Sequence, residues 1–285
     1  LISCVHISMI LRTTLISSIM RQRFLQKKTK RRRKVILRFL HLRKKYLRPA
    51  LTFLDLQLRK GCNTNYDRKW IDGTRTEKLF YNDSHLSKFT AMVLECEPYE
   101  KKEGCYAVEL DRTAFFPEGG GQYADTGKLK DVKVSDVREK NGRILHITDQ
   151  PFEAGEIVEG EIDWETRFMK MQQHTGEHIV SGIVHARYGF NNVGFHLGTE
   201  DCTMDFDGEI SKEALQEIEL EANRAVWKNL TIEVSYPSKE ELEELDYRSK
   251  IEIEGQVRIV SVPGYDICAC CAPHVKQTGE IGQIR

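Results

Sequence analysis

The sequence has no stretch of eighteen or more uncharged apolar residues, and its nearest approach, residues 1–20, is interrupted by Arg12. A helix that spans a bilayer needs about 20 consecutive apolar residues, so we expect no membrane-spanning helix and no membrane partner. The chain also lacks net charge, with 43 Lys+Arg against 43 Asp+Glu. No Gly-Lys-Ser/Thr follows its glycine-rich segment, which argues against a P-loop for nucleotide phosphates.

Acidic residues are scarce at the start of the chain. Residues 1–75 contain 20 Lys+Arg but only Asp55, Asp67 and Asp72 as acidic residues, whereas the rest of the chain holds 23 basic and 40 acidic groups. Such a basic arm is typical of nucleic-acid binding or of an organelle-targeting leader. It is also typical of translated sequence outside a folded protein, and we favour that interpretation. We expect a basic, poorly ordered extension over residues 1–75, with at most a helix over residues 35–58.

Eight cysteines would allow four disulfides, but three of them crowd together as Cys268, Cys270 and Cys271. Adjacent cysteines pair badly, whereas metal ligation is easier to satisfy at this spacing. Disulfides are rare in reducing compartments. We therefore expect thiols or metal ligands and a cytoplasmic location.

Short alternating apolar runs fill the next part of the chain. They predict strands over residues 90–96, 106–110, 132–138, 143–148 and 157–162. Asn141-Gly142 has the form of a tight hairpin turn between two of them. This pattern predicts a small β-barrel domain over residues 76–164.

The remaining part, residues 165–285, mixes both kinds of secondary structure. Apolar residues recur every three or four positions over residues 164–188, with Gly189 placed to end a helix. Ser238 opens a capping box for a further helix. A helix over residues 211–228 and strands over residues 202–206, 231–236 and 257–262 complete an α+β domain.

Two pairs of metal-binding residue types lie in this second domain. His174 and His178 are four apart on the predicted helix, and Cys270 and His274 have the same spacing in the cysteine cluster. Residues at i and i+4 project from one face of a helix, so all four could form a tetrahedral N3S zinc site. Cys271 or Cys268 could replace Cys270. A purely structural zinc ion is the main alternative, because four protein ligands close the coordination shell.

The two histidines also match a peptidase pattern. His174, Glu177 and His178 follow the H-x-x-E-H order of inverted zincins, in which the glutamate is the catalytic base. That class normally takes a downstream glutamate as its third ligand, whereas the concentrated ligands here are Cys and His. We expect Glu177 to be a solvated helix residue.

A glycine-rich segment precedes the helix. Gly119, Gly120 and Gly121 are followed by Gln122 and by Asp-Thr-Gly at residues 125–127. Successive glycines let backbone N–H groups approach a ligand, or adopt positive φ in a bulge or tight turn.

Taken together, these three separated motifs resemble the alanyl-tRNA editing proteins (AlaX) and the editing domain of alanyl-tRNA synthetase. The resemblance runs over residues 76–285 and includes Phe-His-Leu-Gly at residues 195–198 and Thr-Gly-Glu-Ile-Gly at residues 278–282. Residues 1–75 have no counterpart in it. Since such chains usually continue further, we expect the domain to be truncated at its C-terminus.

The resemblance implies a Zn²⁺-dependent hydrolase that removes serine or glycine from mischarged tRNA(Ala). It implies that His174, His178, Cys270 and His274 are the zinc ligands, and it associates Gly119, Gly120 and Gly121 with the longer members of the family. Partners for the serine hydroxyl are sought at Gln122, His196 and Thr203. A zinc-stabilised RNA-binding module without catalysis is a further alternative. The sequence indicates no oligomeric state.

The acidic character of residues 76–285 is unfavourable for tRNA, because polyanion binding depends on Lys and Arg. We therefore expect a local basic strip to carry the contact, formed by Arg167, Lys170, Arg187, Lys276 and Arg285.

Overall fold

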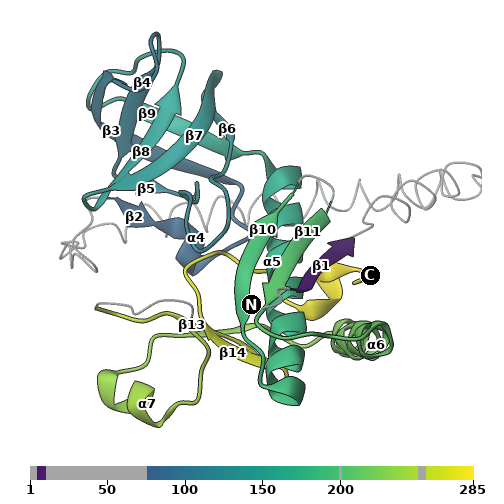
Figure 1. Cartoon of the computed structure of the whole chain (residues 1–285). Helices are drawn as coiled ribbons and strands as arrows, with labels where there is room; N and C mark the ends of the chain where they lie inside the picture. Colours follow the sequence, from purple (N-terminus) through teal and green to yellow (C-terminus); the bar gives the residue numbers. More distant parts are fainter. Residues whose placement is uncertain (1–4, 11–75, 199–200, 250–254) are drawn as a thin grey trace, which may run out of the picture. The chain divides into compact units, whose positions relative to one another are not determined.

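A computed structural model describes residues 5–10, 76–198, 201–249 and 255–285, for residues 5–10 and 201 as backbone only (Figure 1). The described parts combine helices with mostly antiparallel sheets. The predicted α+β class is therefore confirmed. The expected helix over residues 35–58 lies outside the described residues.

Six strands pair into a closed sheet in the first half of the described chain, in the order β3-β4-β8-β7-β6-β9 (Figure 1). Every pairing in this sheet is antiparallel. The strands are β3 (Lys88–Pro98), β4 (Tyr106–Leu110), β6 (Gly127–Leu129), β7 (Val132–Lys140), β8 (Arg143–Thr148) and β9 (Ile157–Ile162). Alternate apolar side chains point inward, and Val108, Val134, Ile144 and Val158 are fully buried. These side chains form a core of their own.

The predicted hairpin turn between β7 and β8 is confirmed. Asn141 has φ 52° and Gly142 has φ 73°, and two successive residues with positive φ are what a type I′ hairpin turn requires. The short strands β2 (Glu77–Lys78), β5 (Arg112–Thr113) and β6 were not predicted. Two or three residues are too few to show an alternating pattern. A single helical turn, α4 (Leu79–Asn82), follows β2.

The helix α5 (Trp164–Tyr188) has the bounds that its apolar spacing predicts. The side chain of Asp163 accepts a hydrogen bond from the N–H of Thr166 at the start, and Gly189 ends the helix with φ 70°. From Arg167 to Val184 almost every residue is buried, polar ones included. A single apolar face would predict a half-buried helix, so the burial of its polar side chains requires partners from other elements.

Two further sheets and three helical segments make up the rest of the described chain. One sheet has the order β1-β11-β10 and the other β12-β13-β14. Their strands are β1 (Val5–Ile10), β10 (Asn192–Leu197), β11 (Asp201–Phe206), β12 (Glu233–Ser235), β13 (Ile259–Val262) and β14 (Asp266–Ala269). The helical segments are α6 (Lys212–Lys228), α7 (Lys239–Glu244), which opens with the predicted capping box at Ser238, and the 3-10 turn η1 (Thr278–Ile281). The side chains between α5, α6 and these sheets form a second core.

Six residues near the start of the chain belong to the described structure. Residues 5–10 form β1, which pairs antiparallel with β11 in the register Val5↔Phe206 to Ile10↔Asp201. An edge strand presents unpaired N–H and C=O groups, and β1 satisfies those of β11. Within the described residues, no helix is both long and apolar enough to cross a bilayer.

Candidate metal centre

Two segments about ninety residues apart supply the predicted metal donors. His174 and His178 project from the same face of α5, with ring centroids 5.4 Å apart. Cys270 and His274 follow β14. The contact between β14 and α5 places these two residues over the histidine face.

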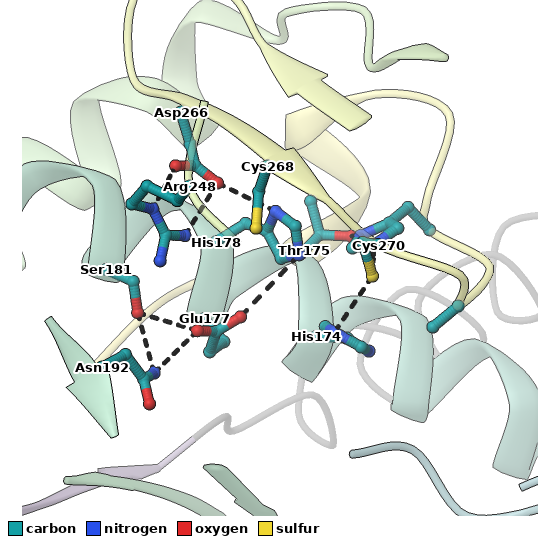
Figure 2. A network of polar contacts seen from close by, with 12 residues as sticks. His174, Thr175, Glu177, His178, Ser181, Asn192, Arg248, Asp266, Cys268 and Cys270 are labelled. Atoms are coloured by element: carbon teal, nitrogen blue, oxygen red, sulfur yellow. Dashed lines mark hydrogen bonds and ion pairs between the residues drawn. The ribbon is translucent and has the colours of Figure 1, made fainter. Parts of the chain in front are cut away.

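The four predicted donors converge. Cys270 Sγ lies 3.6 Å from His174 Nε2 and 3.4 Å from His274 Nε2, and Figure 2 shows the contact with His174. One ligand atom from each of His174, His178, Cys270 and His274 lies within 4.8 Å of the others. In a zinc site with Zn–N of about 2.0–2.1 Å and Zn–S of about 2.3 Å, the donors are about 3.3–3.6 Å apart. The spacing and the chemistry of this donor set therefore fit a single zinc ion.

The neighbouring cysteines take other positions. A Cβ added at Gly120 would lie 3.0 Å from Cys271 Sγ, so the Cys271 thiol faces the glycine-rich turn. Cys268 groups instead with His178 and Asp266. Of the three clustered thiols, the one that meets the three imidazoles belongs to Cys270.

His274 is held in the tautomer that a metal needs. Its Nδ1 lies 3.0 Å from the hydroxyl oxygen of Thr175. That hydroxyl donates its single hydrogen to the carbonyl of Met171 at 2.7 Å, so it accepts a hydrogen bond from His274 Nδ1. Nε2 of His274 therefore carries the lone pair that faces Cys270.

The other two imidazoles have acceptors at the same nitrogen. Gln122 Oε1 lies 3.1 Å from His174 Nδ1. Asp266 Oδ2 lies 2.9 Å from His178 Nδ1, although not in the alignment of a good hydrogen bond. A carboxylate only accepts, so this nitrogen carries hydrogen. Metal-binding histidines commonly donate their second N–H to such partners, and here all three present Nε2 to the centre.

Burial and neighbouring charge set the protonation of the donors. Burial lowers the pKa of His274 to about 3, which keeps this imidazole neutral. Burial alone would raise the pKa of the Cys270 thiol, but the charges and hydrogen bonds of the surrounding histidines hold this pKa well below its ordinary value. Burial would lower the pKa of His178, yet Asp266 and Cys270 raise it well above 6.5. The proton on His178 balances the charge of the Cys270 thiolate, and a metal cation that binds here can take the place of that proton.

The glycine-rich segment forms a tight turn beside this centre. Gly120 and Gly121 have φ of 60° and 80°, and the N–H groups of Gly119 and Gln122 bond across the turn at 3.0 and 2.9 Å. A Cβ at Gly121 would lie 3.2 Å from Cδ1 of Phe195, whose ring in turn lies 5.1 Å from that of His174. Glycine is therefore required at this turn for both its conformation and its close approach.

Gln122 connects the turn to the centre. The residue is fully buried, and while its Oε1 meets His174, its Nε2 has no hydrogen-bond partner within the described residues. A polar cavity of about 490 Å³ adjoins it and is lined by Glu118, Gly119, Gly121, Gln122, Tyr123, Arg138 and Glu139. A buried N–H donor without a partner is costly unless a ligand satisfies it.

Glu177 corrects the expectation of a solvated residue. Its side chain is 2% exposed, and its Oε1 accepts hydrogen bonds from Ser181 Oγ at 2.8 Å and Asn192 Nδ2 at 2.7 Å (Figure 2). The Asn192 partner comes from β10, which had not been predicted. This carboxylate thus belongs to a buried hydrogen-bond network between α5 and β10, and its Oε2 lies 3.8 Å from His178 Nε2.

His196 and Thr203 are not brought to the donor cluster. They face each other across β10 and β11, and His196 is 67% exposed, 3.5 Å from Asp205. Side chains alternate between faces along a strand, so both lie on the face opposite Phe195, which packs against His174.

The expected basic strip is wrong at two of its members. Arg167 is fully buried, and its guanidinium binds the Asp125 carboxylate, with Nε 2.9 Å from both oxygens. Lys170 is 7% exposed and donates to the carbonyl oxygen of Ala124 at 2.7 Å. These two cations attach α5 to the segment after the glycine turn, whereas Arg187, Lys276 and Arg285 are exposed.

Comparison of the sequence with known proteins gives matches to tRNA synthetases and to editing proteins. Residues 58–166 match the family model of class II (A) tRNA synthetases, and residues 257–285 match the second additional domain of threonyl and alanyl tRNA synthetases. The chain is 40% identical over 239 residues to the alanine–tRNA ligase of Natronomonas pharaonis, in an alignment that covers 79% of this chain and 25% of the ligase.

Two relatives are named as editing proteins. The chain is 33% identical over 218 residues to alanyl-tRNA editing protein AlaX-L of Pyrococcus horikoshii, which covers 73% of this chain and 53% of AlaX-L. It is 37% identical over 224 residues to AlaX-M of Saccharolobus solfataricus, which covers 73% of this chain and 91% of AlaX-M. The chain thus spans about a quarter of the ligase and about half of AlaX-L, but nearly all of AlaX-M. At this identity and coverage, the chain belongs to the alanyl-tRNA editing protein family.

Proposed function

We propose that this protein is an aminoacyl-tRNA deacylase that acts on tRNA(Ala) mischarged with serine, and with glycine as a second substrate. The reaction is hydrolysis of the ester between the amino acid and the terminal ribose. One observation carries the proposal: in a member of the editing family, three imidazoles and one thiolate converge on one point. Behind His174 lies Gln122, whose buried Nε2 has no hydrogen-bond partner among the residues that the structure describes. We propose Zn²⁺ as the cofactor and the cytoplasm as the location.

The small difference between alanine and serine explains why such an activity is needed. An aminoacylation site shaped for alanine rejects serine poorly, because an added hydroxyl changes the binding free energy by only about 1–3 kcal/mol. A second site that hydrogen-bonds the hydroxyl can discriminate far better, since alanine would leave its buried polar groups unpaired. The buried Nε2 of Gln122 is such a group.

The residues of the chain have separable tasks. When bound, zinc would supply Lewis-acid polarisation of the ester or a water of lowered pKa, and either would need a coordination position beyond the four protein donors. His174, His178, Cys270 and His274 would hold it. Gln122 would donate from Nε2 to an oxygen of the substrate, while its Oε1 keeps His174 in position.

The neighbouring groups favour the same assignment. The turn of Gly119, Gly120 and Gly121 keeps the backbone close to the centre, and the ring of Phe195 covers His174. The position of His196 and Thr203 on the other face favours Gln122 as the hydroxyl partner. Among the exposed cations, Lys276 lies two residues after His274 and is available to tRNA phosphates, although it pairs with Asp83 at 2.9 Å.

The peptidase alternative loses support. An inverted zincin needs Glu177 as a base beside the metal and a glutamate as third ligand. Glu177 Oε2 does lie 3.8 Å from His178 Nε2. The third and fourth donors, however, are Cys270 and His274 instead of a glutamate, and Glu177 Oε1 accepts two internal hydrogen bonds.

A deacylation assay tests the proposal. Purified protein is incubated with Ser-, Gly- and Ala-tRNA(Ala) and, in parallel, with a peptide, and its zinc content is measured. We expect release of serine well above release of alanine and no peptide cleavage. His178→Ala should lose zinc and serine release together, whereas His185→Ala, an exposed histidine of the same helix, should retain both. Full activity of metal-free His178→Ala, or zinc binding without any deacylation, would contradict the proposal.

A further inference from the structure

A buried polar chain lies behind His178, on the side away from Cys270. Asp266 Oδ2 is 2.9 Å from His178 Nδ1, and Arg248 binds the same carboxylate (Figure 2). The side chain of Asp266 is 1% exposed and that of Arg248 is 14% exposed. Neither residue is one of the four converging donors, and neither belongs to a recognisable sequence motif.

The guanidinium of Arg248 fixes the orientation of the carboxylate. Its Nε lies 2.6 Å from Oδ1 and its Nη2 lies 2.9 Å from Oδ2 of Asp266. Such bidentate pairs hold both partners in one plane. They also offset the cost of burying the Asp266 charge, which would be several kcal/mol for an unpaired carboxylate. One oxygen of the fixed carboxylate is thereby directed at His178.

The same contact explains the grouping of Cys268, His178 and Asp266, whose ligand atoms are also close enough to hold a cation. Both carboxylate oxygens of Asp266 already face a guanidinium. A metal ion at that point would meet a positive charge. The group is therefore better suited to orient His178 than to bind a second metal.

A glycine on α5 lets the start of β14 lie close to this helix. Gly182 lies one turn after His178, and a Cβ added there would lie 2.2 Å from the carbonyl oxygen of Tyr265 and 2.9 Å from Cβ of Asp266. Both distances are too short for any side chain. Only glycine allows the start of β14 to lie on the helix at this turn, and this contact places Asp266 behind His178.

We propose that Asp266 is a positioning residue that orients His178 for metal binding. The ion pair with Arg248 fixes its carboxylate, and Gly182 lets it lie close to α5. The carboxylate, 2.9 Å from Nδ1 although not in good hydrogen-bond alignment, keeps the hydrogen on Nδ1 and leaves Nε2 free toward Cys270 and the other donors. Partners of this kind typically change metal affinity by about 10–100-fold. The inference rests on the metal site of the proposed function and not on its substrate.

Zinc affinity tests the inference without any tRNA. The full chain is titrated against a chromophoric chelator as wild type, Asp266→Ala, Asp266→Asn and Gly182→Ala, with Asp149→Asn as an exposed control. We expect Asp266→Ala to bind zinc about 10–100-fold more weakly, Asp266→Asn to lose less because an acceptor remains, and the control to match wild type. Gly182→Ala should also lose affinity, although alanine favours a helix over glycine by about 1 kcal/mol.

Two further readouts separate orientation from folding. The absorption spectrum of the cobalt-substituted protein should change in Asp266→Ala, because the ligand field depends on how His178 is held. In the wild-type zinc protein, long-range ¹H–¹⁵N spectra should show hydrogen on Nδ1 and metal on Nε2 of His178. This second readout needs no variant and remains valid if the substitutions unfold the chain.

Each outcome decides a different claim. Unchanged zinc affinity and cobalt spectrum in Asp266→Ala and Gly182→Ala, or metal on Nδ1 of His178, would overturn the inference alone. A wild-type chain that binds no zinc would overturn the proposed metal site and the inference with it. Affinities that fall as expected in a protein without deacylase activity would uphold the inference and contradict only the proposed function.

Discussion

Gln122 Oε1 lies 3.1 Å from Nδ1 of His174, which is 52 residues further along the chain. Through this contact the glycine-rich turn, part of the first half of the described chain, reaches the helix that carries two of the four candidate metal donors. The amide thus has one atom on a histidine of the candidate metal centre, and its Nε2 is buried without a partner within the described residues. A single side chain therefore connects the shape of the turn with the chemistry of the centre.

Replacement of Gln122 by alanine should lower the rate of Ser-tRNA(Ala) deacylation by about 10–100-fold. The change removes both the acceptor of His174 and the proposed donor to the substrate. Single-turnover deacylation at measured zinc content checks this expectation, with Gln150→Ala as a control at an exposed position. An unchanged rate at full zinc occupancy would show that the amide takes no part.

Gly120→Ala should reduce activity more than its effect on stability implies. Alanine at φ 60° costs about 1–2 kcal/mol, and its Cβ would also press on Cys271 Sγ at 3.0 Å. Gly104→Ala is the matched control, because Gly104 has φ 73° but open space around it. Unfolding and deacylation are measured for both variants. Equal activity of the two variants would contradict a role for the contact with Cys271.

Arg167→Ala should lower the free energy of unfolding by about 3–5 kcal/mol, because it leaves the buried Asp125 carboxylate without its partner. Arg112→Ala removes a half-exposed ion pair and should cost less than about 1 kcal/mol. Urea unfolding followed by circular dichroism compares the two. A loss below about 1 kcal/mol in Arg167→Ala would mean that the pair contributes little to holding α5.

The stability of the closed sheet should fall as the pH drops from about 6.5 to about 4. Burial lowers the pKa of His146 from 6.5 to about 4, so in this window the unfolded chain binds a proton that the folded protein excludes. A shift of this size corresponds to about 3 kcal/mol, which is present above pH 6.5 and lost at pH 4.

Urea unfolding between pH 4 and pH 7.5 measures this dependence. His146→Gln cannot take up the proton and should lose the corresponding part of the slope. The same pH dependence in wild type and His146→Gln would assign the effect to other groups.

The apolar spacing of residues 164–188 and the glycine at position 189 predicted α5 to the residue. The matched spacings of these residues also predicted that His174, His178, Cys270 and His274 would meet, and their ligand atoms do lie within 4.8 Å of one another. β10 and β14 were missed: Asn192–Leu197 contains a glycine and polar residues, and Asp266–Ala269 merges with the cysteine cluster. Short strands of this kind are defined by their neighbours more than by their own pattern.

The polar residues of α5 could not be placed from their own sequence. Glu177 and Arg167 look like solvent-facing residues of a helix, yet both are buried. Their partners, Asn192 and Asp125, come from other elements. A charged side chain can be buried only where the fold supplies its partner. A single sequence does not show which distant residue that partner is.

X-ray absorption at the zinc edge of the purified wild-type protein tests the central claim most directly. Coordination by His174, His178, Cys270 and His274 predicts one zinc per chain, with three nitrogen neighbours at about 2.0–2.1 Å and one sulfur neighbour at about 2.3 Å. A spectrum without sulfur, one with two or more sulfur neighbours, or a protein without zinc would contradict it.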